Sequence, residues 1–229
     1  MKLAIIPARV GSKRVPEKNI KPFLGKPIIG YSIETALESN LFDEVMVSTD
    51  SDKVADVALS FGAKIPFFRS DKNSDDFATT IDVLLEVLEK YKSIGKTFDE
   101  VCCIYPTAPF VSIELLKKCY SLLVKDKYDS VFPVIRYSFP IQRALRKDKN
   151  NKMKMIFADS KKTRSQDLTP SFQDSGQFYW FNVKPILTKK DLWTDNTGIL
   201  EITEMEAHDI DTIEDWKIAE FKYKLAMND

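Results

Sequence analysis

Residues 2–21 read KLAIIPARVGSKRVPEKNIK, an apolar run that leads directly into a loop rich in cations. From residue 9 to residue 21 the loop contains one acid, Glu17, and one glycine, against five cations: Arg9, Lys13, Arg14, Lys18 and Lys21. The whole chain is balanced, with 34 basic and 34 acidic residues, so these cations are a local concentration. A balanced chain that gathers cations beside its first expected strand is predicted to hold an anionic ligand there.

The first 135 or so residues alternate short apolar runs with longer amphipathic stretches, which is typical of a parallel sheet covered by helices on both faces. Strands are expected in residues 2–8, 43–51, 63–69, 98–110 and 128–137. Helices are expected in residues 28–40, 52–62, 78–92 and 113–125. The predicted fold class is therefore α/β, a three-layer Rossmann-like arrangement with a mainly parallel sheet.

Residues 138–172 break this pattern, since they are polar and basic and have no clear periodicity. Either a hairpin arm or a flexible insert is expected there. A strand is then expected in 175–183 and a helix in 211–227, where Asp211 and Glu214 have the spacing of a capping box.

The composition is that of a soluble globular protein of 229 residues, with 44% hydrophobic and 30% charged residues. Zero net charge argues against a general binder of nucleic acid or anionic membrane, and no apolar segment reaches the ~20 residues that span a bilayer. The first residues lack the layout of a signal peptide, and the three cysteines form neither a disulfide framework nor a metal-spaced set. We therefore expect a cytoplasmic protein without nucleic-acid or membrane partners.

In doubly wound sheets, ligands bind outside the carboxyl ends of the strands, so the residues that follow each expected strand are site candidates. The cationic loop follows the first strand. The residues at the other strand ends are Asp50, Arg69, Tyr105, Pro106 and Thr107. Asp209 and Asp211 lie near the end of the chain, one residue apart. Because cations neutralise phosphates and carboxylates hold Mg²⁺, this set predicts a site for a metal-bound nucleotide.

The cationic loop matches neither of two common nucleotide motifs. It lacks G-x-x-x-x-G-K-[ST], and it has only Gly11 where G-x-G-x-x-G needs three glycines. The loop therefore gives no support to P-loop nucleotide hydrolysis or to the chemistry of dinucleotide cofactors. The remaining interpretation is a loop that binds a triphosphate through backbone amides and cationic side chains.

Each feature also has a plainer interpretation when it is taken alone. The basic loop is compatible with a solvated segment, Asp50 with a turn, and Asp209 and Asp211 with helix capping. His208, the single histidine, is best explained as a turn or rim residue, so any Ser-His-Asp mechanism would depend entirely on it. These interpretations do not explain why the features occur together.

Five stretches, in chain order, resemble the signatures of one enzyme family. They are IIPARVGSKRVPEKNIKPFLGKPII (5–29), FDEVMVSTDSDKVADVALSFGA (42–63), FFRSDKNSDDFATT (67–80), YPTAPF (105–110) and HDIDTIED (208–215). The chain thus resembles the CMP-sialic acid synthetase (acylneuraminate cytidylyltransferase) family over nearly its whole length. Within the family, TRSQDLTPSFQDSGQFYWF (163–181) most resembles the pseudaminic acid cytidylyltransferases.

The resemblance implies one cytidylyltransferase domain over residues 1–229 with a nucleotidyltransferase fold. It implies that CTP and a nonulosonic acid, a nine-carbon α-keto acid sugar, give the CMP-sugar and pyrophosphate, with Mg²⁺ as cofactor. It further implies a homodimer in which residues 139–169 form a protruding arm that reaches the neighbouring subunit and its sugar site.

The resemblance also implies a role for individual residues. Those bound to the triphosphate would be Arg9, Gly11, Ser12, Lys13 and Lys21. Those near the ribose, the cytosine and the nucleotide seat would be Asn19, Arg69, Thr80, Pro106 and Thr107. Asp209 and Asp211 would hold Mg²⁺ and, with Arg9 and Lys21, form the catalytic set. Those lining the sugar site would be Tyr105, Arg164, Gln173, Gln177 and Tyr179, with Arg164 facing the sugar carboxylate.

Three departures from the family pattern point away from sialic acid or alter the phosphate loop. Val10 stands where members often have a second glycine, and a β-branched residue is more restricted there. Tyr105 stands in place of a glutamine, and residues 173–176 read QDSG where sialic acid enzymes have Arg-Pro-Asn-Gly. The favoured sugar is therefore pseudaminic acid.

In the implied reaction, the 2-hydroxyl of the sugar attacks the α-phosphorus of CTP in line. Asp211 is the candidate general base, and a base-free mechanism stays open. Legionaminic, sialic and Kdo acids remain alternative substrates. A GT-A glycosyltransferase, with Asp209 and Asp211 as its D-x-D, and a non-catalytic nucleotide-binding regulator are the alternatives from other classes.

Overall fold

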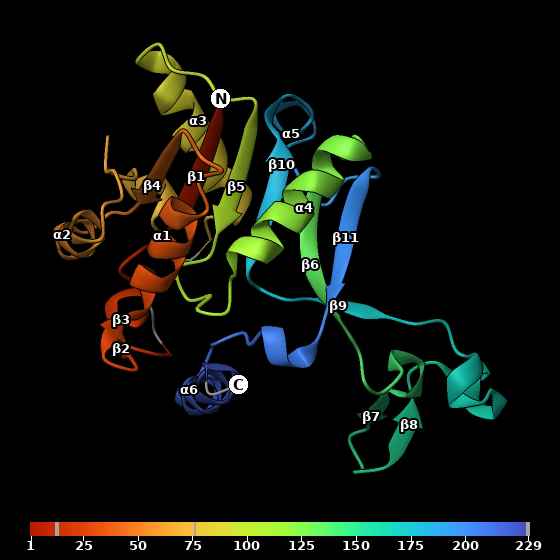
Figure 1. Ribbon diagram of the computed structural model, residues 1–229. Coiled ribbons are helices and arrows are strands. Elements are labelled where there is room, and N and C mark those ends of the chain that lie inside the picture. The colour runs from red at the N-terminus through yellow and green to blue at the C-terminus, as the bar shows by residue number, and fades with distance from the viewer. Residues whose placement is uncertain (12–13, 76, 228–229) are drawn as a thin grey trace.

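The computed structural model describes residues 1–11, 14–75 and 77–227, which form a seven-stranded sheet packed between helices (Figure 1). The sheet consists of β1 (Lys2–Pro7), β4 (Glu44–Ser48), β5 (Glu100–Ile104), β6 (Ser130–Arg136), β9 (Phe172–Asp174), β10 (Phe178–Asn182) and β11 (Thr197–Ile202). The strand order is β11-β6-β10-β5-β1-β4, and β9 pairs with the end of β6.

Most of the strands run in one direction. β1 pairs in parallel with β4 and β5, and β11 pairs in parallel with β6. β10 is antiparallel to both β5 and β6, so these two neighbours run the same way. The prediction of a mainly parallel α/β sheet is confirmed, and the carboxyl ends of five strands lie at one edge.

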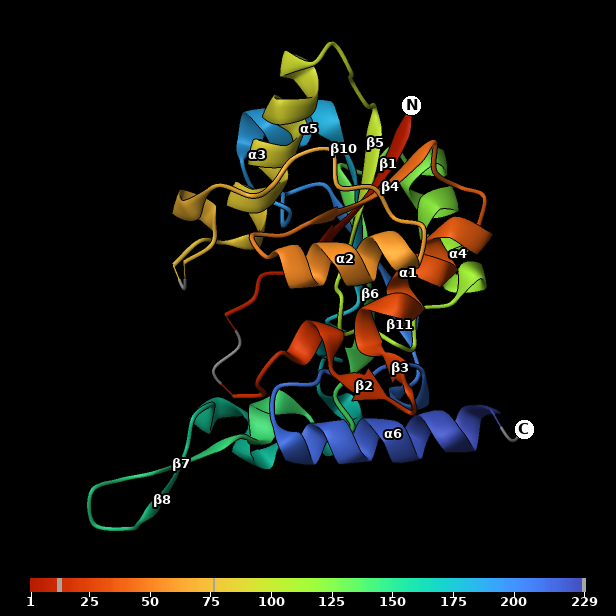
Figure 2. The same cartoon turned by 90° about the vertical axis from the view of Figure 1, so that its left-hand side faces the viewer.

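Helices cover both faces of the sheet (Figures 1 and 2). One face is covered by α1 (Ile28–Glu38), α2 (Asp52–Ser60) and α4 (Ile113–Lys125), and the other by α3 (Thr80–Ser93) and α5 (Val183–Lys189). Successive residues of β1 serve both cores: Ala4 and Ile6 pack on the first face, and Leu3 and Ile5 on the second. A strand buried on both sides is what a continuous apolar run predicts.

A third, smaller core attaches the C-terminal helix beside the cationic loop. It contains residues of α6 (Ile213–Met227) and of β2 (Pro22–Phe23), which pairs with β3 (Lys26–Pro27). The ring of Phe23 meets those of Trp216 and Tyr223 edge to face, at centroid distances of 5.7 and 5.6 Å. Val15 joins the same cluster. The residues that precede α6 are thereby held against the loop that follows β1.

The segment between β6 and β9 projects from the body as an arm (Figures 1 and 2). It carries the antiparallel pair β7 (Leu145–Lys147) and β8 (Met153–Met155), so the hairpin alternative of the sequence prediction is the correct one. Its exposed apolar side chains include Phe139, which is 84% exposed.

The predicted strand at 63–69 is wrong. Lys64 makes a single parallel bridge to Met46, and Pro66, two residues on, has no N–H to extend the ladder. In the described part of the chain, no helix is both long enough and apolar enough to cross a membrane.

Candidate active site

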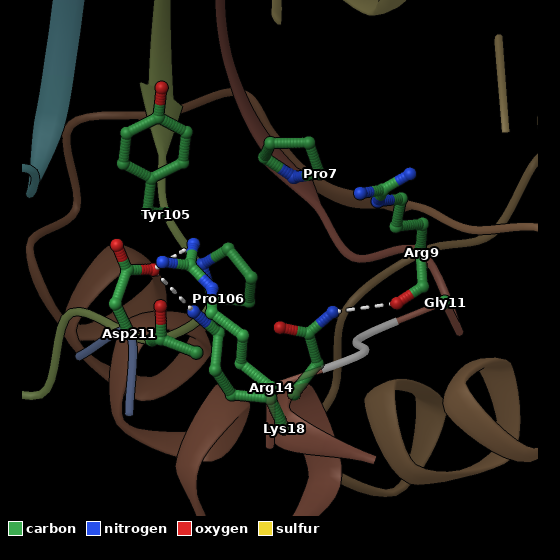
Figure 3. A pocket seen from close by; sticks show the side chains of 10 residues that line it. Pro7, Arg9, Gly11, Arg14, Lys18, Tyr105, Pro106 and Asp211 are labelled. Atoms are coloured by element: carbon green, nitrogen blue, oxygen red, sulfur yellow. Dashed lines mark hydrogen bonds and ion pairs between the residues drawn. The ribbon is translucent and has the colours of Figure 1, made fainter. Parts of the chain in front are cut away.

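A cavity of about 440 Å³ opens at the carboxyl edge of the sheet (Figure 3). It lies between the end of β1, the cationic loop, the end of β5 and the segment before α6. Its lining residues are Pro7, Arg9, Gly11, Arg14, Lys18, Asn19, Tyr105, Pro106, Thr107 and Asp211. The structure therefore brings together seven of the predicted site residues: Arg9, Gly11, Asn19, Tyr105, Pro106, Thr107 and Asp211.

Two cations of the loop meet Asp211 across the cavity (Figure 3). Nη2 of Arg14 lies 2.9 Å from Oδ1 of Asp211, and Nζ of Lys18 lies 3.6 Å from the same oxygen. Nζ of Lys18 also donates to the carbonyl of Ile210 at 2.6 Å. These contacts hold the loop after β1 against the segment before α6.

Asp211 does not cap the C-terminal helix, so the predicted Asp211–Glu214 capping box is wrong. The box is formed one residue later, by Thr212 and Asp215. The Asp215 carboxylate accepts the N–H of Thr212 at 2.7 Å, and the Thr212 hydroxyl accepts the N–H of Asp215 at 3.2 Å. Because Thr212 takes the capping position, the Asp211 carboxylate is left to face the cavity.

Asp209 and Asp211 are chemically suited to a Mg²⁺ ion. The surrounding protein desolvates the Asp209 carboxyl and the Asp211 carboxylate repels its charge, and both effects raise the pKa of Asp209. A bound cation would relieve that repulsion. Among the residues described, no three acidic, histidine or cysteine side chains are placed to hold one metal ion, so further ligands would have to be substrate phosphates and water, as is usual for Mg²⁺.

Three hydrogen bonds hold the cationic loop in place. The Asp50 carboxylate accepts the N–H of Val10 at 3.0 Å. Asn19 donates from Nδ2 to the carbonyl of Arg9 at 2.8 Å, and Nη1 of Arg9 donates to the carbonyl of Asp75 at 2.6 Å. Asp50 therefore holds the loop from the end of β4, which is more than a local turn residue would do.

The lysine predicted at position 21 is not among the cavity residues. Nζ of Lys21 lies over the ring of Trp216, 5.6 Å from its centroid, on the side where α6 packs. Lys18 and Arg14 occupy the cavity instead, and nothing in the sequence spacing distinguishes them from Lys21. Ser12 and Lys13, also predicted to bind phosphate, lie outside the described residues.

Tyr105 separates this cavity from a smaller one of about 310 Å³. The smaller cavity is lined by Thr79, Thr80, Ile81, Tyr105, Tyr179, Asp191, Leu192 and Trp193. The Tyr105 hydroxyl lies 3.1 Å from Oγ1 of Thr80, and its ring meets that of Tyr179 edge to face at 5.9 Å. Burial raises the pKa of Tyr105 to about 12, so its hydroxyl is neutral at physiological pH.

The smaller cavity contains both predicted and unpredicted residues. Thr80, Tyr105 and Tyr179 were predicted from the resemblance. Asp191 and Trp193 were not, because the segment between α5 and β11 carries no motif.

Besides Lys21 and Asp209, four predicted residues line neither cavity. Arg69 is buried and donates to the carbonyl of Ser48 at 2.6 Å. Gln173 is exposed on β9, and Arg164 is exposed on the arm. Gln177 is only 2% exposed and donates from Nε2 to the carbonyl of Glu206 at 2.5 Å. The substrate roles of these four residues stay predictions.

Comparison with known proteins gives consistent matches over nearly the full chain. A family model described as "Cytidylyltransferase" matches residues 3–222. The chain is 41% identical to the pseudaminic acid cytidylyltransferase of Campylobacter jejuni, covering 97% of this chain and 96% of that protein. It is 32% identical to the CMP-N,N'-diacetyllegionaminic acid synthase of Legionella pneumophila, covering 95% and 94%.

The fold also has a counterpart among solved structures. A CMP:2-keto-3-deoxy-manno-octonic acid synthetase complexed with CTP superposes with a TM-score of 0.71, at 18% identity, over 99% of each chain. At this identity, the superposition shows a shared fold only.

Proposed function

This chain belongs to the cytidylyltransferase family, and we propose that it joins CTP to a nonulosonic acid, giving the CMP-sugar and pyrophosphate. Pseudaminic acid is the favoured sugar, because the similarity to the pseudaminic acid enzyme exceeds that to the legionaminic acid enzyme. The observation that carries the proposal is the cavity at the carboxyl edge, in which Arg14 and Lys18 face the Asp211 carboxylate.

The cations of the cavity are suited to the triphosphate. Arg9, Arg14 and Lys18 present their charge from one loop, whose backbone is fixed by Asn19 and Asp50. When CTP enters, its phosphates would replace the Asp211 carboxylate as the partner of Arg14 and Lys18. Fixed cations of this kind stabilise the charge that develops on departing pyrophosphate without reorganising during the reaction.

Asp209 and Asp211 would hold Mg²⁺ once Asp211 is released by the two cations. Mg²⁺, when bound, would neutralise phosphate charge and polarise the α-phosphorus. Pro106 and Thr107, at the end of β5, would support the nucleotide from the opposite wall of the cavity.

The smaller cavity behind Tyr105 is proposed as the sugar site. Three aromatic rings, those of Tyr105, Tyr179 and Trp193, supply apolar surface, and Thr79 and Thr80 supply hydroxyls. Since Tyr105 borders both cavities, a sugar there would bring its 2-hydroxyl towards the α-phosphate. Positioning by the two cavities is the main catalytic contribution that we expect of the protein.

A homodimer is part of the proposal, with the arm of one copy lying on the other. Residues 139–169 carry nine cations against three acids: Arg143, Arg146, Lys147, Lys149, Lys152, Lys154, Lys161, Lys162 and Arg164 against Asp148, Asp159 and Asp167. Residues 191–216 carry nine acids and no lysine or arginine: Asp191, Asp195, Glu201, Glu204, Glu206, Asp209, Asp211, Glu214 and Asp215. This opposite charge, together with the exposed Phe139, favours a second copy as the partner of the arm. Sedimentation at low and high salt tests it, since a monomer at low salt would exclude the dimer.

We place the protein in the cytoplasm. Its three cysteines, Cys102, Cys103 and Cys119, are free and buried, which suits a reducing compartment.

The test is pyrophosphate release from CTP and Mg²⁺ with pseudaminic, legionaminic, sialic and Kdo acids. Release with pseudaminic acid is expected to exceed release with the other acids. Release with a different acid alone would keep the reaction and overturn the sugar assignment. If no acid supports release although CTP binds, the proposed function is wrong and a nucleotide-binding regulator takes its place.

A further inference from the structure

We propose that Gly176 and Gln177 position the Asp209 carboxylate for metal binding, and we call this pair of residues the seat of Asp209. In this proposal Gln177 is a positioning residue rather than a sugar ligand. The inference rests on the proposed function, in which Asp209 is a Mg²⁺ ligand. It assigns the turn at residues 174–176, within the QDSG departure, and the glutamine that follows it to the metal site.

Gly176 lies directly behind Asp209. A Cβ built on Gly176 would stand 3.4 Å from Cγ of Asp209 and 3.6 Å from its Oδ1, which is ordinary van der Waals contact, so Gly176 is a neighbour of the carboxylate. Gly176 also has a φ of +66°, a conformation in which other residues are strained. The backbone conformation therefore makes a side chain at 176 unfavourable, and glycine leaves the position beside the Asp209 carboxylate open.

Gln177 holds the segment that carries Asp209. Its Nε2 donates to the carbonyl of Glu206 at 2.5 Å, three residues before Asp209. Its own carbonyl accepts the N–H of Tyr105 at 2.9 Å, which attaches it to the end of β5. Gln177 therefore connects the rigid edge of the sheet to the segment 206–209, which has neither helix nor strand beyond Glu206.

Asp174 braces the same turn from its other end. Its Oδ1 accepts the N–H of Gly176 at 2.9 Å, and its Oδ2 accepts the hydroxyl proton of Tyr179. Ser175 is 2% exposed, and its N–H reaches the carbonyl of Pro133 in β6 at 3.2 Å. The turn is thus fixed on both sides before it meets Asp209.

Unsatisfied polar atoms are concentrated around this contact. Among the residues described, four buried side-chain polar atoms have no hydrogen-bond partner: one, Oε1 of Gln142, lies on the arm, and the other three are Oγ of Ser175, Oε1 of Gln177 and Nε2 of His208. All three lie within one residue of Gly176 or Asp209. Such groups are rare in native proteins and gather where function constrains the structure, which favours a functional purpose for this turn.

A sugar-binding role for Gln177 fits these observations less well. Its side chain is buried and lines neither cavity, and its amide is committed to Glu206. Loss of the partner that orients a metal ligand commonly lowers metal affinity about 10- to 100-fold. Loss of a sugar ligand would instead raise the KM for the sugar and leave metal affinity unchanged.

The test compares Gln177→Met with the matched control Gln173→Met, which changes an exposed glutamine four residues away. Mn²⁺ binding to the full chain is followed by electron paramagnetic resonance at a fixed CTP concentration, without sugar. CTP affinity is measured separately by calorimetry in EDTA, and folding by thermal unfolding. Gln177→Met should weaken Mn²⁺ binding about 10-fold and leave CTP affinity within twofold, with no change for Gln173→Met.

Asp209→Asn separates failure of the inference from failure of the proposed function. If Asp209→Asn weakens Mn²⁺ binding and Gln177→Met does not, the seat is wrong and the metal site stands. If Asp209→Asn binds Mn²⁺ like the wild type, Asp209 is no ligand, and the proposed metal site fails together with the seat. Should Gln177→Met not fold, Gly176→Ala replaces it in the same comparison, and wild-type Mn²⁺ binding by that variant would overturn the inference.

Discussion

Lys18→Met is expected to weaken CTP binding about 10- to 100-fold, whereas the matched Lys21→Met should change it less than about threefold. The two lysines are three residues apart and were indistinguishable in sequence. The structure separates them, because Lys18 lines the cavity with a side chain only 19% exposed, and Lys21 lies over Trp216. Methionine keeps most of the length of the side chain and removes the charge, so the comparison isolates the ammonium group.

The magnitude follows from the contacts of Lys18. Its Nζ lies 2.6 Å from the carbonyl of Ile210 and 3.6 Å from Oδ1 of Asp211. We expect the phosphates to take over from Asp211, which makes the lost interaction a charge-assisted hydrogen bond of about 1.5 to 3 kcal/mol. Since about 1.4 kcal/mol corresponds to tenfold in affinity, binding should fall roughly 10- to 100-fold.

Calorimetric titration with CTP and thermal unfolding together check this prediction. Lys21→Met removes a cation–π contact of about 0.5 to 1 kcal/mol, so it should lower Tm by roughly 1 to 4 °C and leave CTP affinity nearly unchanged. The reverse pattern, with CTP affinity lost in Lys21→Met and kept in Lys18→Met, would refute the assignment of the cavity as the triphosphate site.

Three further predictions follow from other residues. Asp211→Asn should abolish pyrophosphate release while circular dichroism stays native, and activity near the wild-type level would exclude Asp211 as a metal ligand. Trp193→Ala should raise the KM for the sugar and leave CTP affinity unchanged, since Trp193 lines only the smaller of the two cavities and is 60% exposed. Burial alone would raise the pKa of Glu86, but hydrogen bonds from Lys90 and Ser70 outweigh it and lower the pKa to about 2. Glu86 therefore stabilises the fold above its unfolded pKa of about 4.5, and this stability, on the order of 2–3 kcal/mol, is lost as pH falls towards 2. Glu86→Gln should remove that pH dependence in urea unfolding between pH 5 and about pH 2, and a slope equal to that of the wild type would count against it.

The fold was largely predictable because local pattern and tertiary environment agree. The run at residues 3–6 is apolar on every residue, and the structure buries Leu3 and Ile5 on one face and Ala4 and Ile6 on the other. The segment at 63–69 also contains several apolar residues, beside Lys64 and Arg69, but Pro66 prevents continued pairing beyond the bridge at Lys64. The position of the proline explains why the second segment does not form a strand.

The site was predictable in position and less so in its members. Strand ends indicated where a ligand would lie, and the structure brings the loop after β1, the end of β5 and the segment before α6 together there. Which lysine of the loop faces that point depends on the backbone between residues 14 and 21, and on whether Trp216 offers a competing surface. Trp216 lies on α6, far from Lys21 in the sequence, so the residues around Lys21 do not reveal this contact.

The same argument applies to the carboxylates. Asp211, Thr212, Glu214 and Asp215 all have side chains that suit a helix start, and spacing alone admits two capping boxes. Arg14 determines which of the two capping boxes forms. It lies 197 residues from Asp211 in sequence, and its Nη2 lies 2.9 Å from Oδ1 of Asp211 in space. Because Arg14 and Lys18 offer Asp211 a charged partner, the neutral hydroxyl of Thr212 takes the cap with Asp215, and the N–H of Asp215 in the first turn is still satisfied. A carboxylate freed from capping in this way is available to a metal ion, so the cationic loop that would bind the triphosphate also determines which acid can serve the reaction.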